Sequence, residues 1–159
     1  MERQPVQRIS KRALTLWRIY GGIQFSILLL ISIGLVVATV LWEWPWWITA
    51  VAAALLLIDA VVFIWIVPGL RWKRWRYEVT EQDIDLQYGI FIITRTLVPM
   101  VRVQHVDTEQ GPLLRKFKLS TISISTAATI HKIPALDERE AERLRQSISS
   151  LARVAEDDV

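Results

Sequence analysis

The sequence predicts an α+β membrane protein in which a two-helix transmembrane hairpin precedes an antiparallel β domain that ends in a helix. Two observations predict this division. Residues 19–67 contain only two charged residues, Glu43 and Asp59, whereas residues 77–159 contain 23. Apolar and polar residues alternate in several short runs of the second region, a pattern typical of half-buried strands. We therefore expect a membrane part and a water-exposed part in this chain of 159 residues.

Two apolar runs, residues 19–41 and 46–67, are each long enough to cross a membrane as a helix. They contain 23 and 22 residues, about 34 and 33 Å of helix at ~1.5 Å per residue. A hydrocarbon layer of ~30 Å requires about 20 residues. A cleaved signal peptide is disfavoured, because its apolar core is shorter and a second span follows here at once. Burial of both runs inside so small a domain is disfavoured as well.

The link between the two runs fixes their direction. It spans residues 42–45 and includes Glu43, Trp44 and Pro45, so the helices must be antiparallel, with both chain ends on one side of the membrane. Basic residues precede the first run and follow the second, and the link contains none. Because positive residues remain in the cytoplasm, we expect a multi-pass protein of the cell membrane with both termini cytoplasmic.

The basic residues also predict contact with anionic lipid headgroups, each worth about 1 kcal/mol near the membrane surface. The expected membrane-surface residues are Arg12, Arg18, Arg71, Lys73, Arg74, Arg76, Arg115, Lys116 and Lys118.

Eight tryptophans gather near the predicted span ends, where amphipathic rings favour headgroup depth. The expected interfacial aromatic residues are Trp17, Trp42, Trp44, Trp46, Trp47, Trp65, Trp72 and Trp75.

Asp59 is the one charged residue inside a predicted span. An ionised carboxylate near the midplane costs about 2.5–3.5 kcal/mol on insertion scales. Antiparallel counting from the link places Gln24 and Ser26 within reach, so we expect an intramembrane polar contact among these three residues. Packing of the hairpin or pairing with a partner helix is favoured over a proton or ion relay, because neither span offers a second ionisable group.

Small residues four apart in the spans are compatible with close helix packing, either within the hairpin or against a helix of another chain. The pairs are Gly22 and Ser26, Gly34 and Ala38, and Ala50 and Ala54.

Beyond the spans, the sequence predicts about six or seven antiparallel strands and a closing helix. Pro68 and Gly69 are expected to end the second membrane helix. Strands are expected at residues 75–79, 83–88, 90–94, 101–104, 122–125 and 129–133, with a short helical stretch after Gly111-Pro112. The final helix follows Asp137 and carries Ala141, Leu144, Ile148 and Leu151 at helical spacing.

These boundaries divide the chain into five segments. They are a basic cytoplasmic arm (1–18), the transmembrane hairpin (19–67), a basic juxtamembrane linker (68–76), the β domain with its helix (77–151) and an acidic tail (152–159).

Motifs for catalysis and cofactors are absent from the sequence. Two histidines, His105 and His131, occur without cysteines, and no GxxxxGK[ST], GxGxxG or GxSxG pattern is found. We expect no enzyme activity, no cofactor and no metal site. Nucleic acid is not an expected partner either, because the basic excess flanks the apolar runs.

Several motifs together resemble the YdbS-type family of bacterial membrane proteins. They include Tyr77-Glu78-Val79-Thr80, the run from Arg102 to Asp107 and Gly111-Pro112-Leu113-Leu114-Arg115. The resemblance covers about residues 15–150. It implies a cytoplasmic pleckstrin-homology-like (PH-like) split β-barrel, and a larger partner membrane protein with repeated domains of the same type.

Within this resemblance, the loop expected to bind phosphate reads Thr80-Glu81-Gln82-Asp83, and its acidic residues argue against specific headgroup capture. The predicted function is therefore a membrane-anchored interaction module that assembles with that partner. Two alternatives remain: a small transport or export component that uses Asp59, and a sensor of anionic lipid surfaces.

Overall fold

A computed structural model describes residues 5–157, and the chain divides into two compact units. The hairpin consists of residues 14–70, and the β domain consists of residues 5–13 and 71–157. The elements in chain order are β1 (Gln7–Arg8), α1 (Arg12–Leu41), α2 (Trp47–Asp59), the π-helix η1 (Ala60–Ile66), α3 (Val67–Arg74), β2 (Arg76–Val79), β3 (Asp83–Tyr88), β4 (Thr94–Pro99), the 3-10 helix η2 (Met100–Arg102), β5 (Val103–Glu109), α4 (Pro112–Lys116), β6 (Leu119–Thr126), β7 (Ile130–Asp137) and α5 (Glu138–Asp157).

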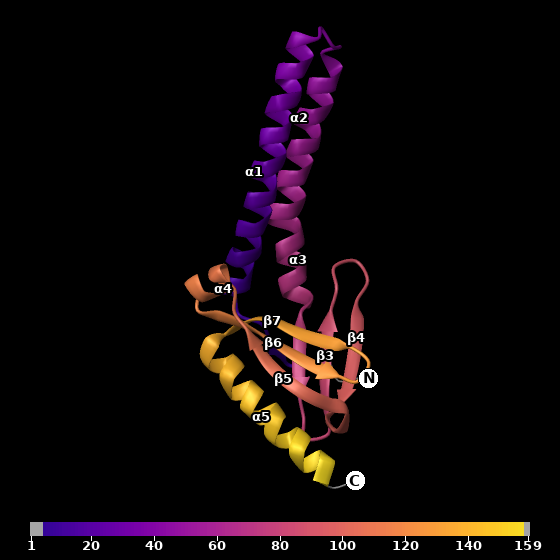
Figure 1. The fold of residues 1–159 in the computed structure, drawn as a ribbon. Helices are drawn as coiled ribbons and strands as arrows, with labels where there is room; N and C mark the ends of the chain where they lie inside the picture. The colour runs from indigo at the N-terminus through magenta and orange to yellow at the C-terminus, as the bar shows by residue number, and fades with distance from the viewer. Residues whose placement is uncertain (1–4, 158–159) are drawn as a thin grey trace. The chain divides into compact units, whose positions relative to one another are not determined.

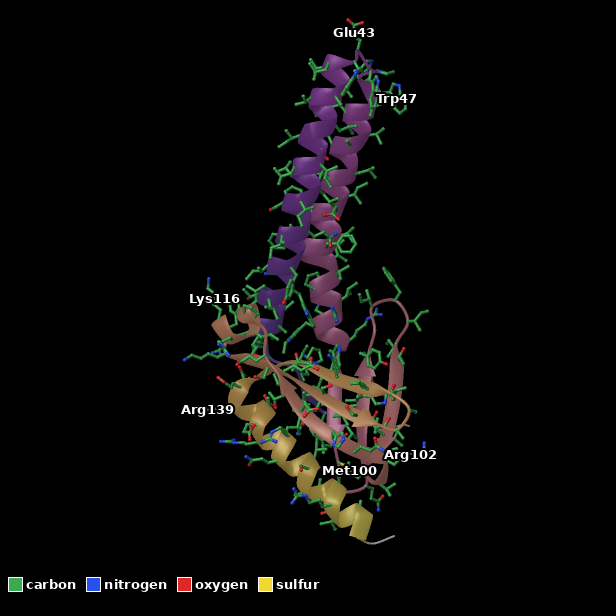
Figure 2. All side chains as sticks on the ribbon, in the orientation of Figure 1. Glu43, Trp47, Met100, Arg102, Lys116 and Arg139 are labelled. Atoms are coloured by element: carbon green, nitrogen blue, oxygen red, sulfur yellow. The ribbon has the colours of Figure 1, made fainter. Side chains whose placement is uncertain are left out.

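The hairpin consists of two long apolar helices that lie side by side (Figure 1). Arg12–Leu41 forms one helix of 30 residues, and α2, η1 and α3 join into a second of 28 residues, Trp47–Arg74. Both are long and apolar enough to cross a membrane. The side-chain oxygens of Thr39 and Thr49 lie 3.2 Å apart near the corner, where Figure 2 shows Glu43 and Trp47.

The sequence predicts that the second helix ends at Pro68. In the structure it continues to Arg74. Within η1 the backbone changes register, so that the N–H of Val67 bonds the carbonyl of Val62 rather than that of Phe63. In this register the Phe63 carbonyl would accept a hydrogen bond from the backbone N–H of residue 68, and proline has no such N–H. The missing donor therefore falls where the hydrogen-bond pattern is already changing, and the chain continues as α3.

The β domain contains two antiparallel sheets. Their strand orders are β1-β2-β3-β4 and β5-β6-β7, and a backbone bond of 3.3 Å from the Ser10 N–H to the Ala135 carbonyl links β7 to the chain after β1. In Figure 1, α5 lies along the three-stranded sheet and closes the domain. The predicted order of two apolar helices, antiparallel sheets and a C-terminal helix is confirmed.

Two local expectations were wrong. The N-terminal arm is not separate from the β domain, because Gln7 and Arg8 pair with Tyr77 and Arg76 of β2. Residues 90–93 form a loop rather than a strand, and β4 begins only at Thr94. Gly89 causes this break, since its φ of 138° lies outside the extended conformation that a strand requires.

The core of the β domain lies between the sheets and α5. Ala141 and Ile148 of α5 are fully buried, as is Tyr77 of β2. The Tyr77 hydroxyl donates to Glu140 Oε1 at 2.8 Å. Burial, the hydrogen bond and the negative charge of Glu140 all raise the pKa of Tyr77, so the phenol remains protonated and can act as the donor.

Candidate functional site

The hairpin contains a polar contact between its two helices. Gln24 Nε2 donates to Asp59 Oδ1 at 2.9 Å. Asp59 Oδ2 is buried and has no hydrogen-bond partner among the described residues. Ser26 does not join this contact, because its hydroxyl donates to the Gly22 carbonyl of its own helix at 2.8 Å. A serine in a membrane helix satisfies itself in this way without any partner helix.

If the Gln24–Asp59 contact serves packing, Asp59→Asn is expected to leave the stability and abundance of the protein unchanged. The asparagine side chain keeps the carbonyl oxygen that accepts from Gln24. Asp59→Ala removes the acceptor and should lower the free energy of unfolding by about 0.5–1.5 kcal/mol. Denaturation in detergent checks both variants. Loss of an ion-linked phenotype in Asp59→Asn at normal abundance would instead support transport.

The predicted interfacial tryptophans fall into two groups. Trp42, Trp44, Trp46 and Trp47 lie exposed around the corner, with the rings of Trp42 and Trp44 6.2 Å apart. Within the hairpin, the Arg18 guanidinium lies 5.0 Å from the ring centroid of exposed Trp65, a cation–π contact. Trp17 is only half-buried.

Trp72 and Trp75 make contacts inside the β domain. Trp72 Nε1 donates to the Ile9 carbonyl at 3.3 Å, and Arg8 lies over its ring. Trp75 is 5% exposed and stacks on Tyr88. The expectation of an interfacial Trp75 was therefore wrong, because this side chain starts the buried face of the strand run that leads to Tyr77.

The predicted membrane-surface basic residues differ in their exposure and in whether they contact other parts of the protein. Arg12 pairs with Asp137 at 3.5 Å, and Arg74 Nη1 donates to the Ile90 carbonyl. Arg76 is partly buried within β2. The exposed members are Arg12, Arg18, Arg71, Lys73, Arg115, Lys116 and Lys118. Figure 2 shows Lys116 extending away from α4.

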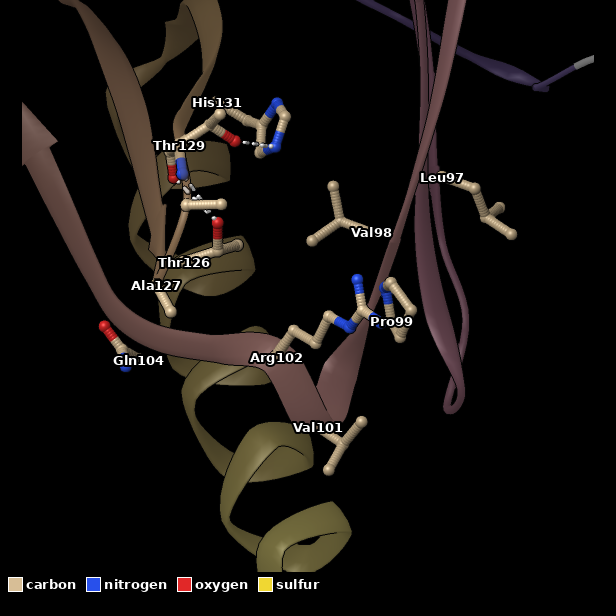
Figure 3. A pocket seen from close by; sticks show the side chains of 11 residues that line it. Leu97, Val98, Pro99, Val101, Arg102, Gln104, Thr126, Ala127, Thr129 and His131 are labelled. Atoms are coloured by element: carbon tan, nitrogen blue, oxygen red, sulfur yellow. Dashed lines mark hydrogen bonds between the residues drawn. The ribbon is translucent and has the colours of Figure 1, made fainter.

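A groove of about 460 Å³ lies in the β domain between the end of β4 and the turn that joins β6 to β7. Figure 3 shows the Val98 and His131 side chains inside it and the Leu97 side chain on the other side of β4. His131 Nε2 lies 2.9 Å from the Thr129 hydroxyl, and Arg102 and Gln104 supply further polar groups. Sequence reasoning missed this groove because no local pattern shows which turn lies beside β4.

A second cavity, of about 560 Å³, is lined by both sheets and by the chain before β2. Trp75, Tyr88 and Ile130 provide its apolar wall. Lys132 and Glu109 line it as an ion pair at 2.7 Å, so their charges are mutually compensated. Within residues 5–157, no group of three or more His, Asp and Glu side chains could hold a metal ion.

An apolar two-helix hairpin followed by two antiparallel sheets and a closing helix defines a membrane protein with a PH-like domain. A family model described as Bacterial PH domain matches residues 18–152, and the chain belongs to this family. The resemblance to YdbS-type proteins is confirmed: UPF0699 transmembrane protein YdbS of Bacillus subtilis (strain 168) is 54% identical over 159 residues, the full length of both chains.

A second relative is much longer than this chain. UPF0699 transmembrane protein YdbT of the same Bacillus strain is 27% identical over 94 residues, which are 55% of this chain and 19% of that protein. No solved structure matches the chain.

Proposed function

We propose that this chain is a membrane-anchored interaction module whose β domain assembles with a larger membrane protein that contains related domains. One Bacillus strain carries both a full-length relative and a longer protein with a related stretch of 94 residues. Domains of shared ancestry have compatible sheet geometry, which supports pairing between a short and a long member of the family.

The open outer edge of β4 is the observation that carries this proposal. In its sheet, β4 is the terminal strand and pairs only with β3 among the described residues. The Met100 N–H donates to the Gln82 carbonyl. This bond shows which residues of β4 direct their backbone groups toward β3, because bonded and non-bonded positions alternate along an antiparallel pair. Val98 and Thr96 therefore bond to β3, whereas the backbone groups of Leu97 point outward. An edge of this kind can accept a strand from another chain.

The groove in Figure 3 lies at the end of the same strand. Strand addition derives affinity from backbone bonds and specificity from neighbouring side-chain pockets. The groove offers apolar Val98 and Pro99 beside polar Arg102 and His131, so it fits a partner segment with alternating apolar and polar side chains.

Leu97→Pro tests the edge directly. Proline removes the outward N–H, its ring blocks an added strand, and no bond to β3 is lost, since proline is tolerated on this side of an edge strand. We expect co-purification of the partner in mild detergent to fall about tenfold, equivalent to ~1.4 kcal/mol. Leu97→Ala, which keeps the N–H, is the matched control. Equal retention by Leu97→Pro and wild type would contradict strand pairing, and a wild-type chain that elutes alone from native membranes would contradict assembly itself.

We also propose that both termini and the β domain lie in the cytoplasm. The distribution of basic residues supports this orientation: nine Lys and Arg lie in residues 1–76, all outside the spans and the link. Lys73, Arg115, Lys116 and Lys118 are exposed and would then face the inner leaflet side, where anionic headgroups attract them.

A further inference from the structure

The loop between β3 and β4 is unusual for a water-exposed domain. Its residues Phe91, Ile92 and Ile93 are 87%, 82% and 54% exposed. Among the described residues of the β domain, this is the one run of three consecutive exposed large apolar side chains. The β2–β3 turn, by comparison, consists of Thr80, Glu81 and Gln82. Contiguous exposed apolar residues mark contacts with protein or membrane.

The conformation of this apolar loop (residues 89–93) is fixed by its own backbone. Gly89 has a φ of 138°, and a Cβ at this position would collide with the Ile92 carbonyl oxygen. The chain therefore turns back on itself so closely that only glycine fits. In Figure 1 the loop projects beyond the ends of the strands, and its three apolar side chains are exposed.

Two contacts tie the apolar loop to the segment that follows the second span. Arg74 Nη1 donates to the carbonyl of Ile90, at the start of the loop. The ring of Trp75 stacks on Tyr88, the residue before Gly89, with centroids 5.9 Å apart and planes inclined by 22°. The base of the loop is therefore held by two consecutive residues of the juxtamembrane chain.

Chain length places these two residues near the membrane surface. Arg74 follows Val67, the end of the second apolar run, by seven residues, and the intervening chain is helical. Seven residues span about 10 Å of helix, while the polar layer on each side of a bilayer is about 5–8 Å thick. The apolar loop thus begins within reach of the headgroup layer, and exposed Lys73 of the same segment suits anionic headgroups.

We propose that the apolar loop inserts into the interfacial layer of the bilayer that the hairpin spans, and that it docks the β domain on the membrane surface. Phe91, Ile92 and Ile93 lie among the upper acyl chains, as the apolar residues of interfacial segments do. Arg74 acts as a positioning residue, because it holds the loop through the Ile90 carbonyl. The bilayer is favoured over a protein partner because the loop is attached to the juxtamembrane segment.

The absence of cysteine from the sequence allows a single-label experiment on the full chain. Ile92→Cys is coupled to a polarity-sensitive fluorophore, and the protein is reconstituted in phosphatidylcholine–phosphatidylglycerol vesicles with or without lipids spin-labelled near the headgroup. We expect a blue-shifted emission at position 92 and strong quenching by the spin-labelled lipids. The matched control, Glu81→Cys in the polar β2–β3 turn, should show water-like emission without quenching.

Two results would overturn the proposal. Water-like emission at position 92 would place the loop in solvent. Blue-shifted emission without quenching by the lipid label would assign the loop to a protein contact. Adding Arg74→Gln to the labelled chain should reduce the quenching, whereas Arg139→Gln, which changes an exposed arginine of α5, should not, and unchanged quenching in Arg74→Gln would refute the positioning by Arg74. The vesicles contain this chain alone, so the outcome is independent of the proposed assembly with a larger protein.

Discussion

Replacing Arg95 with alanine is expected to lower the free energy of unfolding of the β domain by about 3 kcal/mol. Arg95 lies on β4, and its guanidinium holds the Asp85 carboxylate of β3 through Nε at 3.1 and 3.0 Å and through Nη2 at 2.6 Å. Asp85 itself is only 6% exposed. The alanine variant would leave this carboxylate buried without the charge that compensates it.

The magnitude follows from the burial of the two partners. Breaking a buried ion pair by removing one partner costs about 3–5 kcal/mol, because an uncompensated charge remains. The Arg95 side chain is 35% exposed and the Asp85 side chain 9% exposed, so water screens part of the interaction and the lower end applies. Asp85→Ala should cost less, since Arg95 can then turn its charge into solvent.

Hydrogen–deuterium exchange of the β3 and β4 amides in the full chain measures this effect locally, without assuming that both units unfold together. The control is the double variant Asp85→Leu/Arg95→Met, which removes both charges and keeps apolar volume. Such replacements are often neutral, so we expect near-normal protection. Normal protection in Arg95→Ala alone would show that water solvates Asp85 and would refute the argument.

Features encoded by neighbouring residues could be predicted from the sequence. Residues 19–41 contain no charged residue, and alternation marks β3 from Asp83 to Tyr88, the same bounds that the structure shows. The short link sets an antiparallel count that places Gln24 and Ser26 within reach of Asp59, and the structure brings Gln24 and Asp59 together. Each inference uses short-range periodicity or a short closed loop.

Features that depend on distant segments could not be predicted in this way. The pairing of Gln7 with Tyr77 joins residues 70 positions apart, and a two-residue strand has no periodicity of its own. The groove combines β4 with the turn at Thr126–Thr129. The helix continues past Pro68 because η1 changes the hydrogen-bond register, a change that the apolar sequence Ala60–Ile66 does not signal.

The small residues of the hairpin also show that spacing along the sequence does not identify contacts between distant segments. Spacing singled out Gly22 with Ser26, but a Cβ added at Gly22 would meet nothing within 4 Å. The close approach occurs at the neighbouring Gly21, where a Cβ would lie 2.6 Å from the Phe63 carbonyl oxygen of the other helix. Spacing identifies pairs of small residues on one helix face, but it does not identify the face that packs.

Gly21→Ala is therefore expected to destabilise the hairpin, whereas Gly22→Ala is expected to stabilise it. Alanine in a helix is favoured over glycine by about 0.5–1 kcal/mol, and at position 22 no neighbour opposes this gain. At position 21 the methyl group meets backbone that cannot rotate away. The helices must separate there, at a cost of about 1–3 kcal/mol.

The Phe63 carbonyl explains why the hairpin adapts poorly to that methyl group. It receives no bond from Val67, whose N–H bonds Val62, nor from Pro68, which has no N–H, so the wider π-turn directs this oxygen toward the other helix. Moving it would disturb η1 and the adjoining Gln24–Asp59 contact as well as the local packing.

The midpoint of unfolding in sodium dodecyl sulfate should fall for Gly21→Ala and stay the same or rise for Gly22→Ala. Equal shifts of the same sign would show that both glycines matter only through helix propensity, and that no close approach exists at Gly21.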